Sequence, residues 1–402
     1  MNNSEFFYKK ANELGQGVTF LSESDDYIYT SCISIYKYIW HKFNDVRGVL
    51  SLCALHKRKN KRFKPELLSI LQDALKKSEH PDLVVFYCIC VIQNHPSKEA
   101  DVLITQAKDW VKEGTNAYSL FVLFQACVFW QESKFEKYCD GIVTFFENKN
   151  DKFLPYIAIP SATAWVGYNE PSGNVSSSFI LDVQTLLPTF EPEYIISVSC
   201  DSNYLNLYGE VFINSLSRLS DKFYCQISIT DSTNMTVQDE RIKIVEQNIL
   251  SNENTGPISS ALRYIHAHEF SKNARCPVLV MDFDTAMLKS PKCLIEQCAS
   301  YDVGLRVLGN VLPWEKITAG FSIFNNTYAS KRFLNIIYNF FLHTLDLDDK
   351  QWWVDQNAIE CAFRFSSQGD FSHINVMNHL PSLAIIPTGT TAAKLEQLKK
   401  SI

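Results

Sequence analysis

Two aspartates, Asp282 and Asp284, stand one residue apart directly after an apolar run. The run, Val278–Met281, consists of β-branched and long aliphatic side chains, which predict a strand buried on both faces of a sheet. Ligands of open α/β sheets bind at the carboxyl ends of the strands, where two aspartates are costly to desolvate without a cation or hydrogen-bond donors. Mg²⁺ and Mn²⁺ prefer such oxygen ligands and keep substrate phosphates and water as the others. The sequence therefore predicts a metal site at Asp282 and Asp284.

The pair resembles the Asp-x-Asp motif of GT-A fold glycosyltransferases, in which two aspartates hold a metal that bridges the diphosphate of a nucleotide sugar. The similarity is to the group of glycogenin and the bacterial galactosyltransferases, and it covers about residues 193 to 390. It implies Mn²⁺ or Mg²⁺ as cofactor, a nucleotide sugar, above all a UDP-sugar, as donor, and a glycan, a lipid-linked sugar or a protein as acceptor. It also implies a place in glycan or polysaccharide biosynthesis of the bacterial type.

Residues before the acidic pair resemble the donor-binding positions of that family. The stretch Tyr194–Asp201 predicts a strand that brings Ser199 and Asp201 to its carboxyl end, followed by a helix and a second strand in a βαβ unit. Asp201 resembles the acidic residue that hydrogen-bonds the base, and Tyr204 resembles the aromatic residue that stacks on it. Alternatively, Asp201 caps the following helix and Tyr204 packs beneath it.

Arg263 lies in a predicted helix that begins at Thr255 and leads into the acidic pair. It resembles the arginine with which the family reaches the donor. A planar guanidinium suits a pyrophosphate or a carboxylate because its donors form a fork. The alternative is a surface arginine that pairs along its own helix.

Residues after the acidic pair complete the resemblance. Thr318 and Gly320 match the acceptor-side strand, where a glycine lets substrate approach the backbone. Asp355 and Gln356 match an Asp-Gln pair that lies near the anomeric carbon in retaining members. The family's C-terminal His-x-x-Gly-x-x-Lys segment, which supplies a third metal ligand, is missing here. The only late histidines are His373 and His379, for which a structural role is expected.

Two other classes of function stay open. Haloacid-dehalogenase-type phosphatases also carry Asp-x-Asp after an apolar strand, with the first aspartate as nucleophile. Against that class, position 286 is alanine where threonine or valine is usual, and the strand comes late in the chain. The second class is a helical-repeat interaction scaffold with an inactive transferase domain, which the missing histidine segment favours.

Composition bounds the protein more broadly. The 402 residues suffice for two or three domains, and 46% hydrophobic with 20% charged residues is an ordinary folded composition. The net charge of −6 argues against nucleic acid as a partner. The basic run 56–64 predicts a solvated loop or a contact with an acidic surface. Scattered cysteines, no signal peptide and no membrane span predict a cytoplasmic protein.

The expected architecture has two folded parts. Helical spacing of apolar residues predicts an all-α domain over residues 1–150, either repeat-like or irregular, in which a helix over 134–146 is included. Through this domain the protein is expected to contact a membrane surface or another protein. A Pro-containing linker over 151–192 follows. Residues 193–402 are expected to form an α/β domain with a GT-A-like, Rossmann-related, mixed but mostly parallel sheet.

Overall fold

The structure, a computed structural model, describes residues 3–16, 24–60, 63–128, 183–247, 255–308, 316–345, 354–367, 369–387 and 391–400. The described residues fall into two compact units, one up to residue 128 and the other from residue 183 onward. The predicted linker over 151–192 lies mostly outside the described residues, as does the predicted helix over 134–146.

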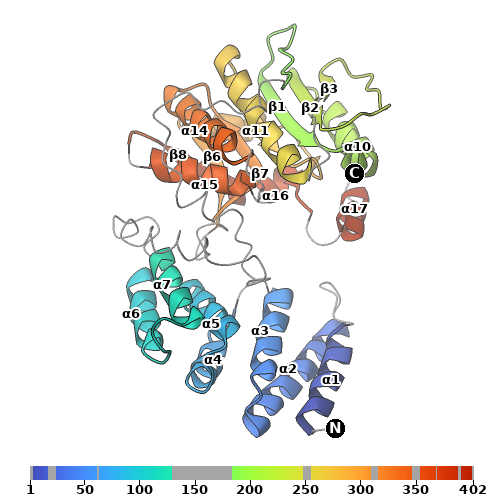
Figure 1. Ribbon diagram of the computed structural model, residues 1–402. Coiled ribbons are helices and arrows are strands. Elements are labelled where there is room, and N and C mark those ends of the chain that lie inside the picture. Colours follow the sequence, from blue (N-terminus) through green and yellow to red (C-terminus); the bar gives the residue numbers. More distant parts are fainter. Residues whose placement is uncertain are drawn as a thin grey trace. The chain divides into compact units, whose positions relative to one another are not determined.

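The described part of the first unit is helical, as the spacing of its apolar residues predicts (Figure 1). Its helices are α1 (Asn3–Gln16), α2 (Ser24–Phe43), α3 (Val46–Asn60), α4 (Leu67–Leu75), α5 (Pro81–Asn94), α6 (Ser97–Lys108) and α7 (Asn116–Val128). Helix α5 begins at Pro81 because proline has no N–H to lose in a first turn. Fully buried Trp40, Tyr87 and Phe121 contribute to its core.

The predicted loop in the basic run is wrong for its first half, because α3 continues to Asn60. Val49, Leu52 and Cys53 are buried along one face of this helix, and that apolar periodicity carries on into the run. His56, at the start of the run, is buried, and its Nδ1 lies 3.0 Å from the hydroxyl of Tyr29. The first residues of the basic run therefore continue a helix whose position is set by its buried apolar face.

The second unit is built on a seven-stranded sheet in the order β3-β2-β1-β4-β7-β6-β8. The β1–β2, β2–β3, β1–β4 and β6–β8 pairs are parallel, and β7 runs antiparallel to both β4 and β6. The sheet is therefore mixed and mostly parallel, as predicted. The strands are β1 (Tyr194–Cys200), β2 (Phe223–Ile229), β3 (Ile242–Glu246), β4 (Val278–Met281), β6 (Val303–Val307), β7 (Ile317–Phe324) and β8 (His373–Asn375).

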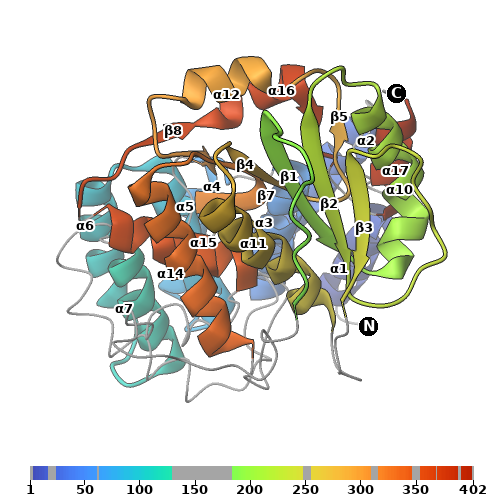
Figure 2. The same ribbon diagram turned by 90° about the horizontal axis from the view of Figure 1, so that it is seen from above.

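Helices cover both faces of this sheet (Figure 2). One face carries α11 (Thr255–Asn273), α14 (Tyr328–Thr344) and α15 (Val354–Ser366). The other packs an apolar core against α10 (Ser202–Ser217), α12 (Lys292–Cys298), α16 (Leu380–Leu383), α17 (Thr391–Lys399), a 3₁₀ helix η3 (Val376–Asn378) and the two-stranded sheet of β5 (Ala286–Met287) and β9 (Ala384–Ile385). Among the described helices of the chain, none is long and apolar enough to cross a membrane.

Strand β1 lies at a reversal in the order of the sheet. The chain passes from β1 to β2 and β3 on one side, and then returns to place β4 on the other side of β1. In open α/β sheets ligands bind in the crevice outside the carboxyl ends of the strands at such a switch point. The carboxyl ends of β1 and β4, and hence Asp201 and Asp282, flank that crevice.

Residues 183–187, which precede β1, are held against the sheet by buried polar side chains. The backbone N–H of Gln184 donates to Gln247 Oε1 at 2.8 Å, and that of Leu186 donates to Gln226 Oε1 at 2.9 Å. The hydroxyl of Thr185 lies 2.8 Å from His266 Nδ1 on α11. This stretch is therefore part of the packed structure of the second unit.

His266 should make the second unit sensitive to acid. Burial lowers the pKa of His266 from 6.5 to about 3, so below pH 6.5 the unfolded chain binds a proton that the folded chain does not. Between pH 7 and pH 5 the free energy of unfolding should fall by about 2 kcal/mol through this residue alone. Urea unfolding at both pH values should show that His266→Phe removes this part of the pH dependence. An unchanged slope in the variant would contradict the assignment.

Candidate functional site

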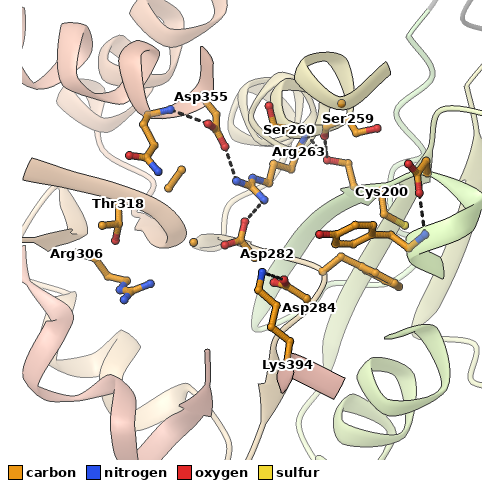
Figure 3. Close-up of a pocket in the computed structure, with 18 residues that line it drawn as sticks. Cys200, Ser259, Ser260, Arg263, Asp282, Asp284, Arg306, Thr318, Asp355 and Lys394 are labelled. Carbon is orange, nitrogen blue, oxygen red and sulfur yellow. Dashed lines mark hydrogen bonds and ion pairs between the residues drawn. The ribbon is translucent and has the colours of Figure 1, made fainter. Parts of the chain in front are cut away.

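A cavity of about 260 Å³ opens at the carboxyl ends of β1 and β4 (Figure 3). This volume is close to the lower end of the range for small-molecule sites, roughly 300–1,000 Å³. Eighteen residues line the cavity, and the ten residues that the sequence singled out are all among them: Ser199, Asp201, Tyr204, Arg263, Asp282, Asp284, Thr318, Gly320, Asp355 and Gln356. Side chains up to 157 positions apart in the sequence thus meet at one place.

At the centre of the cavity, Arg263 joins two carboxylates. Its Nη1 donates to Asp282 Oδ1, and its Nη2 donates to Asp355 Oδ2 at 2.6 Å. The side chains of Arg263 and Asp355 are 6% and 7% exposed, and that of Asp282 is 35% exposed. Burial alone would lower the pKa of Arg263, but the two carboxylates outweigh it and the net change is a rise. The alternative of a surface arginine paired along its own helix is therefore wrong.

Two serines of β1 fix the helix that carries Arg263. The Ser197 hydroxyl donates to the backbone oxygen of Arg263 at 2.7 Å. The Ser199 hydroxyl donates to the backbone oxygen of Ser259 and accepts from the N–H of Arg263 at 3.2 Å. Because these hydroxyls face α11 from a buried strand, they fix the position of α11 along the direction of β1. The Ser199 hydroxyl thus acts both as a donor and as an acceptor toward α11.

Asp284, the second residue of the acidic pair, is paired with a residue that the sequence did not suggest. Lys394, on α17, donates to Asp284 Oδ2 at 2.5 Å. Burial raises the pKa of Asp284, the neighbouring charge of Asp282 raises it further, and Lys394 acts against both. The mutual repulsion of Asp282 and Asp284 is the electrostatic condition that a bound cation relieves.

Asp201 and Tyr204 lie at the β1 end of the cavity. Asp201 Oδ1 accepts from the N–H of Tyr204 at 2.7 Å and so caps α10, which was the alternative interpretation of this residue. The ring of Tyr204 lies 5.2 Å from that of Tyr208, centroid to centroid, and is partly buried against the core. Both side chains nevertheless reach the cavity, so the structural and the ligand-binding interpretations coexist in this geometry.

Asp355 and Gln356 enter the cavity from the first turn of α15. Burial raises the pKa of Asp355 to about 6, although Arg263 acts in the opposite direction. Both oxygens of Asp355 have partners, since Oδ1 accepts from the N–H of Gln356 at 2.8 Å and Oδ2 accepts from Arg263. The carboxylate is therefore held in one orientation.

Gly320, on β7, leaves room for the side chains that meet over it. A Cβ at this position would lie 2.6 Å from Asp282 Oδ2 and 3.0 Å from Arg306 Nη1. Any larger residue would push both groups away from the cavity. The requirement for glycine is thus steric and comes from Asp282 and Arg306, whereas the approach of substrate to this backbone stays a prediction.

The acidic pair has a donor set that fits a divalent cation. Asp282 Oδ2 and Asp284 Oδ1 have no hydrogen-bond or ion-pair partner among the residues that the structure describes, and both belong to hard carboxylates. The described part of the chain contains no cluster of three or more His, Cys, Asp or Glu side chains placed for a metal. Two protein ligands, with substrate phosphate and water as the rest, match the way Mg²⁺ is commonly held.

Several cavity residues were not predicted from the sequence. Ser259 and Ser260 lie one turn before Arg263 on α11, and this spacing of three and four could have indicated them. Arg306 is a charged residue inside a strand of apolar pattern, which is a weaker signal. Lys394 has no local signal, because only the tertiary fold brings α17 to Asp284.

Other chemically interesting side chains are excluded from a role here. Burial raises the pKa of the Cys200 thiol well above its usual range, so this cavity residue stays protonated and is a poor nucleophile. His373 and His379 do not line the cavity. The ring of His373 instead stacks against Phe371, at 5.9 Å between centroids, in agreement with the structural role expected for it. All eleven cysteines in the described residues are free.

No protein-family model matches the sequence, and no curated protein matches it. Glycosyltransferases are among the solved structures that resemble the chain. The WbbM bifunctional glycosyltransferase aligns at 14% identity and a TM-score of 0.32, over 54% of this chain and 46% of that one. GlyE of Streptococcus pneumoniae TIGR4 aligns at 14% identity and a TM-score of 0.31, over 46% of each chain. Mouse xyloside xylosyltransferase 1 aligns at 8% identity and a TM-score of 0.29, over 46% of this chain and 84% of that one. This chain thus spans about half the length of WbbM and GlyE, and likeness at such low TM-scores does not establish an activity.

Proposed function

We propose that the protein transfers a sugar from a nucleotide diphosphate sugar to an acceptor, with Mn²⁺ or Mg²⁺ held by Asp282 and Asp284. One observation carries the proposal. The acidic pair lies at the switch point of the sheet, in a cavity that has Asp201 and Tyr204 at one end and Gln356 at the other. This arrangement suits a ligand with a base, a diphosphate and a sugar in that order.

The centre of the cavity would hold the diphosphate. A divalent ion bound to Asp282 and Asp284 would supply Lewis acidity to the leaving diphosphate. Arg263 keeps Asp282 in place through its ion pair, and Lys394 brings a second cation beside Asp284. The cavity is lined by four aspartates, two arginines and one lysine. Because the negative side chains outnumber the positive ones, a diphosphate needs an added cation to enter it.

The two ends of the cavity would hold the base and the sugar. Tyr204 presents an aromatic ring, and Asp201 has an oxygen, Oδ2, with no partner among the described residues. At the other end, the side chain of Gln356 offers both a donor and an acceptor to sugar hydroxyls. The fixed carboxylate of Asp355 would stabilise positive charge that develops on the sugar in the transition state.

Thermal unfolding with UDP tests the metal site. UDP should raise the midpoint of the wild-type protein only when Mn²⁺ or Mg²⁺ is present, because a ligand that binds the folded state alone stabilises it. At a UDP concentration one hundred times the dissociation constant, the gain should be about 2.7 kcal/mol. The double variant Asp282→Asn with Asp284→Asn should lose this gain.

Asp370→Asn is the matched control, since Asp370 is exposed and does not line the cavity. An equal stabilisation by UDP without metal would count against the site. Incubation with a panel of nucleotide sugars and Mn²⁺ should then release nucleoside diphosphate. Hydrolysis of an aryl phosphate that depends on Asp282 would instead indicate a phosphatase, and metal-dependent binding without any turnover would indicate an inactive scaffold.

A further inference from the structure

Arg306 lies at the end of the cavity away from β1 and reaches it through an irregularity in the sheet. Its strand, β6, pairs with β7, and the register shifts between Leu305 and Arg306, so that Arg306 stands opposite Thr318. Such irregularities re-aim a side chain at the edge of a site. Figure 3 shows Arg306 and Thr318 next to each other, on the far side of Asp282 from Cys200.

Arg306 is the cavity cation without a partner in the described part of the chain. Arg263 is paired with Asp282 and Asp355, and Lys394 is paired with Asp284. For Arg306 no hydrogen bond or ion pair to a described residue exists, and its Nε is fully buried. Burial lowers the pKa of Arg306, and the charge of Asp282 acts in the opposite direction. A half-buried charge without a hydrogen-bond or ion-pair partner is costly, so its presence in a cavity indicates a ligand that pairs with it.

Thr318 adds a second unsatisfied group at the same point. Its Oγ1 is buried and has no hydrogen-bond partner among the described residues. Lys316, the residue before β7, instead places its Nζ 5.6 Å from the centroid of the Phe363 ring. The bare backbone of Gly320 keeps the space before the guanidinium open. A guanidinium and a hydroxyl, each without a hydrogen-bond partner among the described residues, therefore meet in the same part of the cavity.

We infer that Arg306 and Thr318 bind an anionic group, a carboxylate or a phosphate, on the sugar that occupies this end of the cavity. The inference rests on the proposed function, which places a sugar here. A planar guanidinium binds carboxylate and phosphate through two parallel hydrogen bonds, whereas a neutral hexose gives it no charge to pair with. The anion belongs either to the transferred sugar of the donor or to the acceptor sugar.

Calorimetric titrations distinguish these two sources. With Mn²⁺ present, the wild-type protein should bind UDP-glucuronate about tenfold to a hundredfold more tightly than UDP-glucose if the donor carries the anion. If the acceptor carries it, the protein should show the same preference for glucose 6-phosphate over glucose, measured with and without UDP. Arg306→Gln should abolish the preference and leave the affinity for UDP itself unchanged, and Arg306→Lys should restore it only in part.

Arg275→Gln is the matched control, because Arg275 is exposed and does not line the cavity. Equal affinity for anionic and neutral sugars in both titrations would overturn the inference. So would an Arg306→Gln variant that weakens UDP, UDP-glucose and UDP-glucuronate alike, since the guanidinium would then act on the diphosphate or on Asp282. Failure of UDP to bind would count against the proposed function alone, because the titration of glucose 6-phosphate without nucleotide still tests Arg306.

Discussion

Arg263→Met is expected to lower the free energy of unfolding of the second unit by about 3–5 kcal/mol, the largest stability effect we anticipate from a single change at the site. The substitution leaves two carboxylates without their guanidinium partner. Asp355 is buried and would lose the one cationic partner that it has among the described residues, and Asp282 would lose the donor to its Oδ1. Methionine fills a similar volume, so the loss would report charge rather than packing. Urea unfolding followed by circular dichroism measures it.

A second substitution separates charge from shape in this experiment. Arg263→Met with Asp355→Asn removes the stranded charge, and it should recover at least about 1 kcal/mol of the loss, because residues in one ion-pair network do not behave additively. Arg275→Met, at an exposed position, should stay within about 0.5 kcal/mol of the wild type. If the double variant were as unstable as Arg263→Met alone, the bridge to Asp355 would have little energetic weight.

Asp355→Asn is expected to lower turnover of the nucleotide sugar about 10²–10³-fold, by analogy with the removal of other groups that stabilise transition-state charge. Asparagine has the same shape but a single acceptor oxygen, which can keep the hydrogen bond from Arg263 or the one from the N–H of Gln356 but not both, so the variant loses the negative charge together with one hydrogen bond. An interaction realised mainly in the transition state lowers turnover and leaves donor affinity nearly intact. Steady-state release of nucleoside diphosphate, together with calorimetric affinity for UDP and Mn²⁺, measures both quantities.

The same pair of measurements identifies other roles for Asp355. Turnover equal to that of the wild type would remove Asp355 from the chemistry. A parallel fall in UDP affinity and in stability would assign it a structural role through Arg263. Asp370→Asn again serves as the control for loss of an aspartate charge in the same unit.

The sequence was most informative where an apolar run ends in a polar group. Strands β1 and β4 are such runs, and their ends, Asp201 and Asp282, can be located because a buried strand needs continuous apolar residues and a parallel sheet aligns the carboxyl ends. Strand β3 and the short strands β5, β8 and β9 went unpredicted. Strands β5, β8 and β9 have two or three residues each, too few for a pattern to differ from that of a loop. Strand β3 is interrupted by Lys243 and ends in Glu246, so it lacks the continuous apolar run that marks β1 and β4.

The partners of the site residues were the least predictable part. Arg263 was equally consistent with a surface position, and only the packing of α11 on β1 and of α15 on β7 shows that it joins two carboxylates. Lys394 meets Asp284 across 110 positions of sequence. Contacts of this kind depend on tertiary geometry, whereas the periodicity of apolar residues reports only on each element's own buried face.

The bridge made by Arg263 also bears on how this protein can change over time. One guanidinium binds carboxylates from β4 and from α15, so positions 263, 282 and 355 share a single electrostatic balance. A descendant that loses the guanidinium inherits two carboxylates without their cation, and it survives more readily if a second position changes with the first. The three positions are thus expected to covary among related chains.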